Sequence, residues 1–190
     1  MEIQKKNLNY VFRVEVSGLG EKLERDIIID CNDNLASLAY MVLASINALS
    51  HHMFSMTVKY NHDLKFSCIL MEGQQDKYVQ ELRAREHDLW KFNLSEGDVI
   101  EMDYGYSVKW HFFIQLIERR VETKSYEIPY VLSGKGFGIV EDVSNEVVAN
   151  LLSQKTLYDG IDYTRFIKDD ERFSDHFKML KLIYENIKEA

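Results

Sequence analysis

The chain has 190 residues, of which 46% are hydrophobic and 12% aromatic, and this is ample to bury one sizeable core. Its 31 acidic and 23 basic residues give a net charge of -8, so most of the surface should repel a polyanion and nucleic-acid binding is disfavoured. No apolar run approaches the roughly 18 residues that span a bilayer, and no N-terminal stretch has the form of a secretory signal. We therefore expect a cytoplasmic protein that does not engage a membrane.

The first fifty residues predict two strands and then a helix. Residues 10–16 alternate between apolar and polar side chains, as a half-buried strand does, and a glycine-containing turn leads to a second strand at 23–30. Over 32–49 the apolar period changes from two to about 3.6, which predicts a helix of about four turns packed on the hairpin. Asp33 or Asn34 is available as its N-cap.

Four further strands are predicted in the middle of the chain. They occupy residues 53–60, 64–71, 97–104 and 108–117. Gly105 stands where the last two strands must reverse direction, and glycine makes such a reversal cheap. The polar stretch 74–88 is compatible with a loop or an exposed helix. Residues 126–145 contain the only proline and three of the nine glycines, so they predict an ordered loop.

The C-terminal part predicts helices, a short one at 145–152 and a longer one near the end of the chain. The longer helix would carry a single apolar stripe made by Phe173, Phe177, Leu180, Ile183, Tyr184 and Ile187. We expect a domain over 1–150 and a helical extension over 151–190 whose stripe packs on that domain. A surface for a partner helix is the alternative use of the stripe.

No motif in the chain specifies a reaction. Cys31 and Cys68 form no C-x-x-C pair, so they predict reduced thiols without a disulfide or a zinc ribbon. No G-x-S-x-G element is present, and no cofactor is indicated. The sequence therefore favours a protein that is not an enzyme. Asp103, Glu141 and Asp142 nevertheless lie beside turns, where carboxylates can serve either as loop caps or in acid-base catalysis.

Two other groups of residues are candidate ligand sites. The histidines at 51, 52, 62 and 111 do not predict a metal site, because neighbouring residues such as His51 and His52 point apart in regular backbone. The glycine-rich stretch 133–138 can present backbone N–H groups to a phosphate, but it lacks the spacing of a P-loop.

Three segments resemble the plasmid pRiA4b ORF-3-like family, some of whose members are described as passenger proteins of insertion elements. The family pattern D-L-x-x-x-x-L-x-x-G-D is matched by Asp88, Leu89, Leu94, Gly97 and Asp98. The pattern Y-D-F-G-D-x-W-x-H is matched in part by Asp103, Tyr104 and Gly105. The pattern P-x-x-L-x-G-x-x-x-x-P-x-E-D-x-G-G is matched by Pro129, Leu132, Gly134, Glu141 and Asp142. The resemblance covers residues from about 10 to 150.

The departures from the family pattern fall in its second and third segments. Tyr106 replaces an aspartate, Val108 a tryptophan and Trp110 a histidine, while Ser144 and Asn145 stand where the family has two glycines. Part of any family site is therefore remodelled in this chain or serves a structural role.

The resemblance implies an α+β fold, a roll of mixed strands around the first helix. This agrees with the strand-strand-helix-strand order predicted from the residues, which is similar to a β-grasp and is followed by the predicted C-terminal helices. The resemblance also implies an association with plasmids and transposable elements and no established activity. A recombinase activity is disfavoured, because the chain offers neither an activated serine among arginines nor a basic DNA-binding module.

We expect a non-catalytic binding or adaptor domain of a bacterial mobile element, with a protein as its partner. The predicted contact surface comprises the Gly105 turn and the 129–145 loop, and its candidate residues are Asp103, Tyr104, Tyr106, Trp110, Tyr130, Lys135, Phe137, Glu141 and Asp142. Two alternatives remain open. One is a small enzyme or ligand-binding protein with Asp103, His111, Glu141 and Asp142 around one pocket. The other is a weak nucleic-acid binder that uses Lys135, Arg119 and Arg120.

Overall fold

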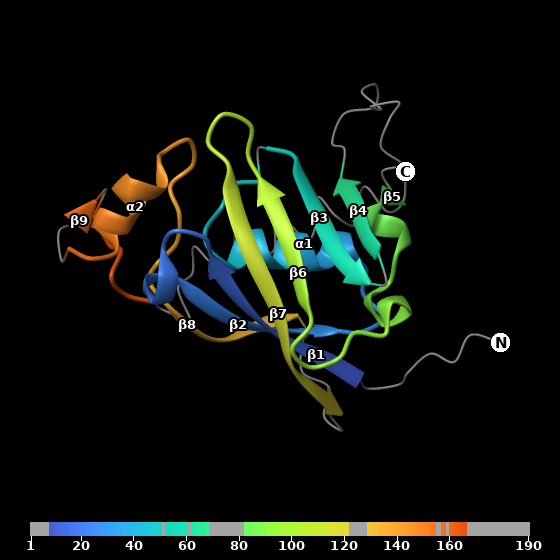
Figure 1. Ribbon diagram of the computed structural model, residues 1–190. Coiled ribbons are helices and arrows are strands. Elements are labelled where there is room, and N and C mark those ends of the chain that lie inside the picture. The colour runs from blue at the N-terminus through green and yellow to red at the C-terminus, as the bar shows by residue number, and fades with distance from the viewer. Residues whose placement is uncertain are drawn as a thin grey trace.

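A computed structural model describes residues 8–50, 52–60, 62–68, 82–121, 129–154, 157–158 and 160–166 (Figure 1). Their main element is one large, mostly antiparallel β-sheet with the helix α1 against one face. The elements are β1 (Leu8–Val16), η1 (Gly20–Lys22), β2 (Glu24–Asp30), α1 (Leu35–Ser45), β3 (Phe54–Tyr60), β4 (His62–Cys68), β5 (Leu82–Arg83), η2 (Ala84–Glu86), η3 (Leu89–Phe92), β6 (Val99–Tyr104), β7 (Trp110–Val121), β8 (Tyr130–Lys135), α2 (Asn145–Leu151), β9 (Leu157–Tyr158) and β10 (Ile161–Asp162).

The eight strands of the sheet follow the order β5-β4-β3-β6-β7-β1-β2-β8, and β9 and β10 form a separate two-stranded ladder. Every neighbouring pair in the sheet is antiparallel except β4 and β5, which run parallel. The predicted α+β class is confirmed. The β-grasp-like order is not confirmed, since β1 lies between β2 and β7 and is antiparallel to both.

The core lies between the sheet and α1, where alternate residues of strands such as β1, β6 and β7 are buried. On β1 these residues are Tyr10, Phe12, Val14 and Val16, as the alternation of the sequence predicts. All residues of α1 except Ser37 are buried, so the helix is apolar on nearly all sides rather than amphipathic. The Asn34 side chain caps it by accepting a hydrogen bond from Ser37 N, 3.0 Å away.

The helix α1 has 11 residues, about one turn fewer than predicted. It ends at Ser45 because Asn47 adopts a left-handed conformation with φ 60°, which an α-helix cannot continue. Leu49, which the periodicity places on the buried stripe, is therefore outside the helix and 42% exposed.

The predicted loop over 126–145 contains a strand, β8, which pairs with β2 at the edge of the sheet. The sequence conceals this strand because its residues include Gly134 and because a bulge breaks its alternation: Ser133 pairs with Asp26 and Val131 with Ile27, so that the register skips Leu132. The strand predicted at 64–71 begins two residues earlier than expected, since β4 starts at His62.

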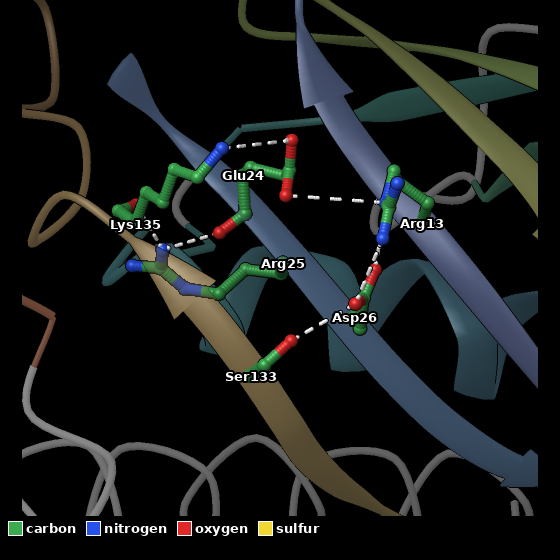
Figure 2. A network of polar contacts seen from close by, with 6 residues as sticks. All are labelled: Arg13, Glu24, Arg25, Asp26, Ser133 and Lys135. Atoms are coloured by element: carbon green, nitrogen blue, oxygen red, sulfur yellow. Dashed lines mark hydrogen bonds and ion pairs between the residues drawn. The ribbon is translucent and has the colours of Figure 1, made fainter. Parts of the chain in front are cut away.

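Gly134 is required by a buried arginine on the neighbouring strand. Arg25 is fully buried, and a Cβ at Gly134 would lie 2.8 Å from Arg25 Cδ. The guanidinium donates to the carbonyls of Ser45, Glu24, Lys135, Gly136 and Phe137 at 2.5–2.8 Å (Figure 2 shows its contacts with Glu24 and Lys135).

This arrangement ties β2 to the end of α1 and to the segment after β8. Burial lowers the pKa of Arg25 to about 9, and no carboxylate takes part in the hydrogen bonds described for it. The five carbonyl dipoles compensate the buried charge, because each replaces a hydrogen bond that water would otherwise accept.

The described part of the C-terminal region contains one of the two predicted helices. The short predicted helix corresponds to α2, whereas the apolar stripe from Phe173 to Ile187 lies outside the described residues. The packing of a 151–190 extension on the domain therefore stays a prediction. In the part of the chain that the structure describes, no helix is both long and apolar enough to cross a membrane.

Candidate functional site

Three loops meet at one end of the sheet, the end from which β3 and β7 start. They are residues 46–50 and 52–53 after α1, residues 105–109 between β6 and β7, and residues 136–142 after β8. Gly105 N donates to Met53 O at 3.2 Å, and Ile139 N donates to Ile46 O at 2.9 Å. These backbone hydrogen bonds join segments that are far apart in the sequence. We call this region the loop end.

Glu141 is the central polar residue of the loop end. Its Oε1 accepts a hydrogen bond from the Tyr104 hydroxyl at 2.6 Å and another from Leu49 N at 2.7 Å. Tyr104 is fully buried and belongs to β6, so the carboxylate of one loop is anchored both to the sheet and to the loop after α1. A charged acceptor that receives two short hydrogen bonds is a strong structural clamp.

His52 lies over the same clamp. Its Nε2 is 3.1 Å from Asp142 Oδ1 and 3.7 Å from Glu141 Oε2, and its ring meets the Tyr104 ring edge to face with centroids 5.8 Å apart. Its side chain is 25% exposed and that of Asp142 is 63% exposed. The cluster thus runs from a buried tyrosine hydroxyl to a solvent-exposed carboxylate.

The backbone around this cluster is unusual, because two further non-glycine residues, in addition to Asn47, adopt left-handed conformations. Ser50 and Asp142 both have φ 58°. Such conformations cost free energy and persist only where the surroundings enforce them. Here the contacts of Leu49 and Glu141 hold the two loops in this shape.

The Gly105 turn is confirmed as the reversal between β6 and β7. Gly105 has φ 101°, and a Cβ there would collide with the carbonyl of Val108. Only glycine combines this dihedral angle with so close an approach of the backbone. The glycine is therefore explained by the turn alone.

The predicted aromatic surface is only partly exposed. Tyr106 is 82% exposed, but Tyr104 and Trp110 are buried, so these two cannot serve as exposed contact anchors. They point toward α1 because they occupy core positions of β6 and β7. Tyr130 and Phe137 are half-buried, and Phe137 packs against the Tyr163 ring with centroids 5.2 Å apart.

Asp103 and His111 form a separate pair on the opposite face of the sheet. His111 Nδ1 lies 2.7 Å from Asp103 Oδ1. Strand alternation directs Asp103 away from Tyr104, the residue that contacts Glu141. Asp103 and His111 therefore do not share one pocket with Glu141 and Asp142, as the enzyme alternative requires.

The register also places Ser55 next to Asp103 on this face, giving a row of Ser55, Asp103 and His111 across three strands. The carboxylate stands in the middle of the row. Nucleophile activation needs the imidazole between the hydroxyl and the carboxylate, so this order does not reproduce that arrangement.

The three basic residues of the nucleic-acid alternative are engaged within the chain. Lys135 Nζ is 3.8 Å from Glu24 Oε2, and Arg120 forms a two-pronged contact with Glu118 at 2.8 and 2.7 Å. The Arg119 guanidinium lies 5.9 Å from the centre of the Tyr10 ring. These three side chains therefore do not form a group of free positive charges available to a phosphate backbone.

The glycine-rich stretch 133–138 faces the interior with its carbonyls rather than offering N–H groups to a ligand. Its carbonyls accept from Arg25, while Phe137 N donates to Tyr163 O at 3.0 Å. Gly138 permits a close approach, since a Cβ there would collide with the Ile46 carbonyl. A phosphate cradle is not built from these groups.

Within the described ranges, no three His, Cys, Asp or Glu side chains gather as a metal-binding group. His51 and the side chain of His62, which belonged to the histidine set considered from the sequence, lie outside those ranges.

The sequence did not reveal three contributors to the loop end, namely Leu49, His52 and Met53. Leu49 and Met53 are exposed apolar residues, at 42% and 50%. The sequence carried no signal for these two residues, because the helical period places Leu49 on the buried stripe and Met53 begins the predicted strand 53–60.

The fold and the loop end together define an α+β protein built on one largely antiparallel sheet with three clamped loops at one end. The chain belongs to the plasmid pRiA4b ORF-3-like family, whose model matches residues 9–155. A search of curated proteins finds no match.

The chain is also similar to a crystal structure of a protein of unknown function from Methanosarcina mazei Go1. The TM-score is 0.68 at 17% sequence identity, and the alignment covers 86% of this chain and 97% of that chain. A likeness at this level of identity shows that the two proteins share a fold.

The matched family segments have distinct structural positions. In the first, Leu89 N donates to Asp33 O, and His87 O beside it accepts from Leu35 N, so this segment fixes the start of α1. The second and third meet where Tyr104 donates to Glu141. Asn145, at a family glycine position, opens α2 and donates from Nδ2 to Ser17 O at 3.3 Å.

Proposed function

We propose that this protein is a non-catalytic binding module that contacts a protein partner through its loop end. The observation that carries the proposal is the set of exposed apolar side chains there. Tyr106 is 82% exposed, Met53 50% and Leu49 42%, and each belongs to one of the joined loops. Large apolar or aromatic side chains on a fixed surface are typical anchors of protein interfaces.

The rigidity of the loops supports this assignment. Glu141 holds the loop after α1 through Leu49 N, and the Met53 carbonyl accepts from Gly105 N beside Tyr106. Because these contacts already order the loops, binding a partner would cost little further conformational entropy. The exposed Asp142 carboxylate next to His52 provides a polar rim.

The proposal includes a cytoplasmic location and a role in a mobile genetic element, as the family association implies. A protein partner is favoured over nucleic acid because the chain carries a net charge of -8 and because Lys135, Arg119 and Arg120 have partners within the chain.

The test is a tagged pull-down from native host lysate with nuclease present, comparing the wild type with a Tyr106→Ala/Met53→Ser double variant. We expect a defined protein at stoichiometric level with the wild type and a loss of at least about tenfold with the double variant, as for an interface hot spot. Tyr106 and Met53 are exposed, so the double variant should fold.

Val121→Ser is the matched control. Val121 is 70% exposed at the far end of β7, away from the Gly105 turn (Figure 1). It should bind as the wild type does. Retention of the same partner by the double variant would refute the loop end as the contact surface, and recovery of nucleic acid alone would refute the protein-binding role.

A further inference from the structure

The face of the sheet opposite α1 carries a second set of side chains, and Figure 1 looks onto this face. On the central strands the outward positions include Arg13 and Glu15 of β1, Glu101 of β6, and Phe113 and Gln115 of β7. They alternate with core residues along their strands, and in Figure 1 the labelled helix α1 lies on the other side of the sheet.

A hollow of about 160 Å³ opens on this face, lined by Arg13, Glu15, Val99, Phe113 and Gln115. This volume corresponds to roughly five water molecules, enough for one charged group and a short apolar stem. Phe113 is 38% exposed, which is unusual for a phenylalanine in the middle of a sheet. The hollow thus combines an accessible aromatic ring with polar walls.

The register places carboxylates on both sides of that ring. Phe113 is paired with Glu15 on β1 and with Glu101 on β6. Cross-strand neighbours lie about 5 Å apart at Cβ, so both acidic side chains originate beside the ring. The His111 ring meets Phe113 edge to face, with centroids 4.7 Å apart at 83°, and so holds its orientation.

Arg13 also lines the hollow and its charge acts on Glu15, but its side-chain hydrogen bonds are made to Asp26 rather than to Glu15. Its Nε and Nη2 donate to the two carboxylate oxygens of Asp26 at 2.9 and 3.1 Å, and Glu24 lies 3.9 Å away (Figure 2). Ser133 supports Asp26 from the other side with a 2.9 Å hydrogen bond. Glu15 is left as the exposed carboxylate in the wall of the hollow.

We propose that this hollow binds one organic cation, an alkylammonium or guanidinium group, seated over the face of Phe113 and neutralised by Glu15. The aromatic face attracts a cation through its quadrupole, and the neighbouring carboxylate supplies the counter-charge. Gln115 can accept from the N–H groups of the ligand through its side-chain carbonyl. The overall charge of -8 favours the approach of such a ligand.

The same chemistry occurs in a free polyamine and in a lysine or arginine side chain, and the probes separate these sources. Binding of Nα-acetyl-arginine N-methylamide, of its neutral citrulline counterpart and of spermidine is followed by chemical-shift changes of the full-length protein at low salt. We expect the arginine probe or spermidine to shift the NMR resonances of Phe113 and its strand neighbours. The citrulline probe should bind at least about fivefold more weakly. Tighter binding of the arginine probe would identify a protein side chain as the ligand, and tighter binding of spermidine would identify a free polyamine.

Two variants and one control locate the site. Glu15→Gln and Phe113→Leu should each weaken the cation about two- to fivefold, whereas Glu146→Gln removes an equal charge from exposed α2 and should leave binding unchanged. Glu15 is exposed, so its variant tests the site even if Phe113→Leu perturbs the fold.

Three results would overturn the assignment. Equal binding of the citrulline probe would remove the role of charge, and shifts centred away from β1, β6 and β7 would remove the location. If Glu146→Gln weakened cation binding as much as Glu15→Gln does, the binding would reflect only general attraction by the net charge of the protein.

Discussion

Glu141 connects more of the loop end than any neighbouring side chain described there, since it contacts Tyr104, Leu49 and His52. We expect Tyr104→Phe and Glu141→Gln to destabilise the protein non-additively, with a coupling free energy of about 1–2 kcal/mol, because each variant removes the same charge-assisted hydrogen bond. Urea denaturation of the two single variants and the double variant measures this coupling. Additive effects would show that the 2.6 Å contact contributes no energy of its own, and Tyr106→Phe is the control on an exposed tyrosine.

Arg25 joins three segments through hydrogen bonds to backbone carbonyls, and its guanidinium also lies 4.4 Å from the centre of the Phe166 ring. Replacement by methionine keeps much of the apolar stem but leaves those carbonyls without donors. The relief of a buried charge offsets this only in part, so we expect a loss of about 3 kcal/mol in the free energy of unfolding. Arg165→Met, whose side chain is 75% exposed, should cost less than about 0.5 kcal/mol. A stable Arg25→Met protein in urea denaturation would mean that the carbonyls find other donors.

Asp26 gives the outward face a pH dependence. Burial acts to raise the pKa of Asp26, but hydrogen bonds from Arg13 and Ser133 and the charges of Arg13 and Lys135 outweigh it, so the pKa is lowered. A carboxyl group with a lowered pKa in the folded state stabilises the protein above its unfolded pKa of about 3.9, and this contribution disappears as the pH falls through the folded pKa.

Asp26→Asn should therefore cost about 1 kcal/mol at pH 7, and the difference from the wild type should shrink below about pH 4. Thermal unfolding at a series of pH values tests this. A difference that is constant from pH 7 to pH 3 would assign the effect to packing rather than to charge.

At the scale of elements, a comparison of Gly105 in the β6–β7 turn with Gly97 separates two reasons why a position requires glycine. One is a positive φ, and the other is a backbone neighbour too close for a Cβ. Gly105 has φ 101° and a close backbone neighbour, whereas Gly97 has φ 97° and no atom within 4 Å of the position that a Cβ would occupy. Gly97→Ala should cost about 1 kcal/mol from the dihedral angle alone. Gly105→Ala should cost at least about 2 kcal/mol more, because the turn must open to avoid the Val108 carbonyl.

Denaturant unfolding of the two alanine variants provides the comparison. Equal losses for Gly105→Ala and Gly97→Ala would indicate that the turn relaxes freely around the new methyl group. In that case the loop end is less rigid than the proposed binding role assumes.

At the scale of the whole molecule, the strand order predicts the pattern of amide exchange. The strands β1 and β7 lie inside the sheet and pair on both sides, while the two-residue strands β9 and β10 pair only with each other. Exchange in β1 and β7 should require global unfolding, and β9 and β10 should exchange through local opening several orders of magnitude faster. Hydrogen-exchange mass spectrometry measures both. Comparable protection would mean that the β9–β10 ladder unfolds together with the sheet.

Local patterns predicted the elements whose periodicity is strong. The alternation of β1, the helical period of α1 and the Gly105 reversal were all legible because each arises from contacts between near neighbours. The strand β8 was missed, since glycine and a bulge obscure its alternation and its partner β2 lies about a hundred residues earlier.

The amino-acid sequence by itself determined the α+β class, the family, and the existence of a turn and a loop with candidate contact residues. Only the tertiary structure decided which of these residues meet. It separates Asp103 from Glu141 by placing them on opposite faces, buries Tyr104 and Trp110, and brings His52 to Asp142. The physical reason is that the side of a strand on which a residue lies follows from period and register, whereas contact between loops follows from how distant strands pair.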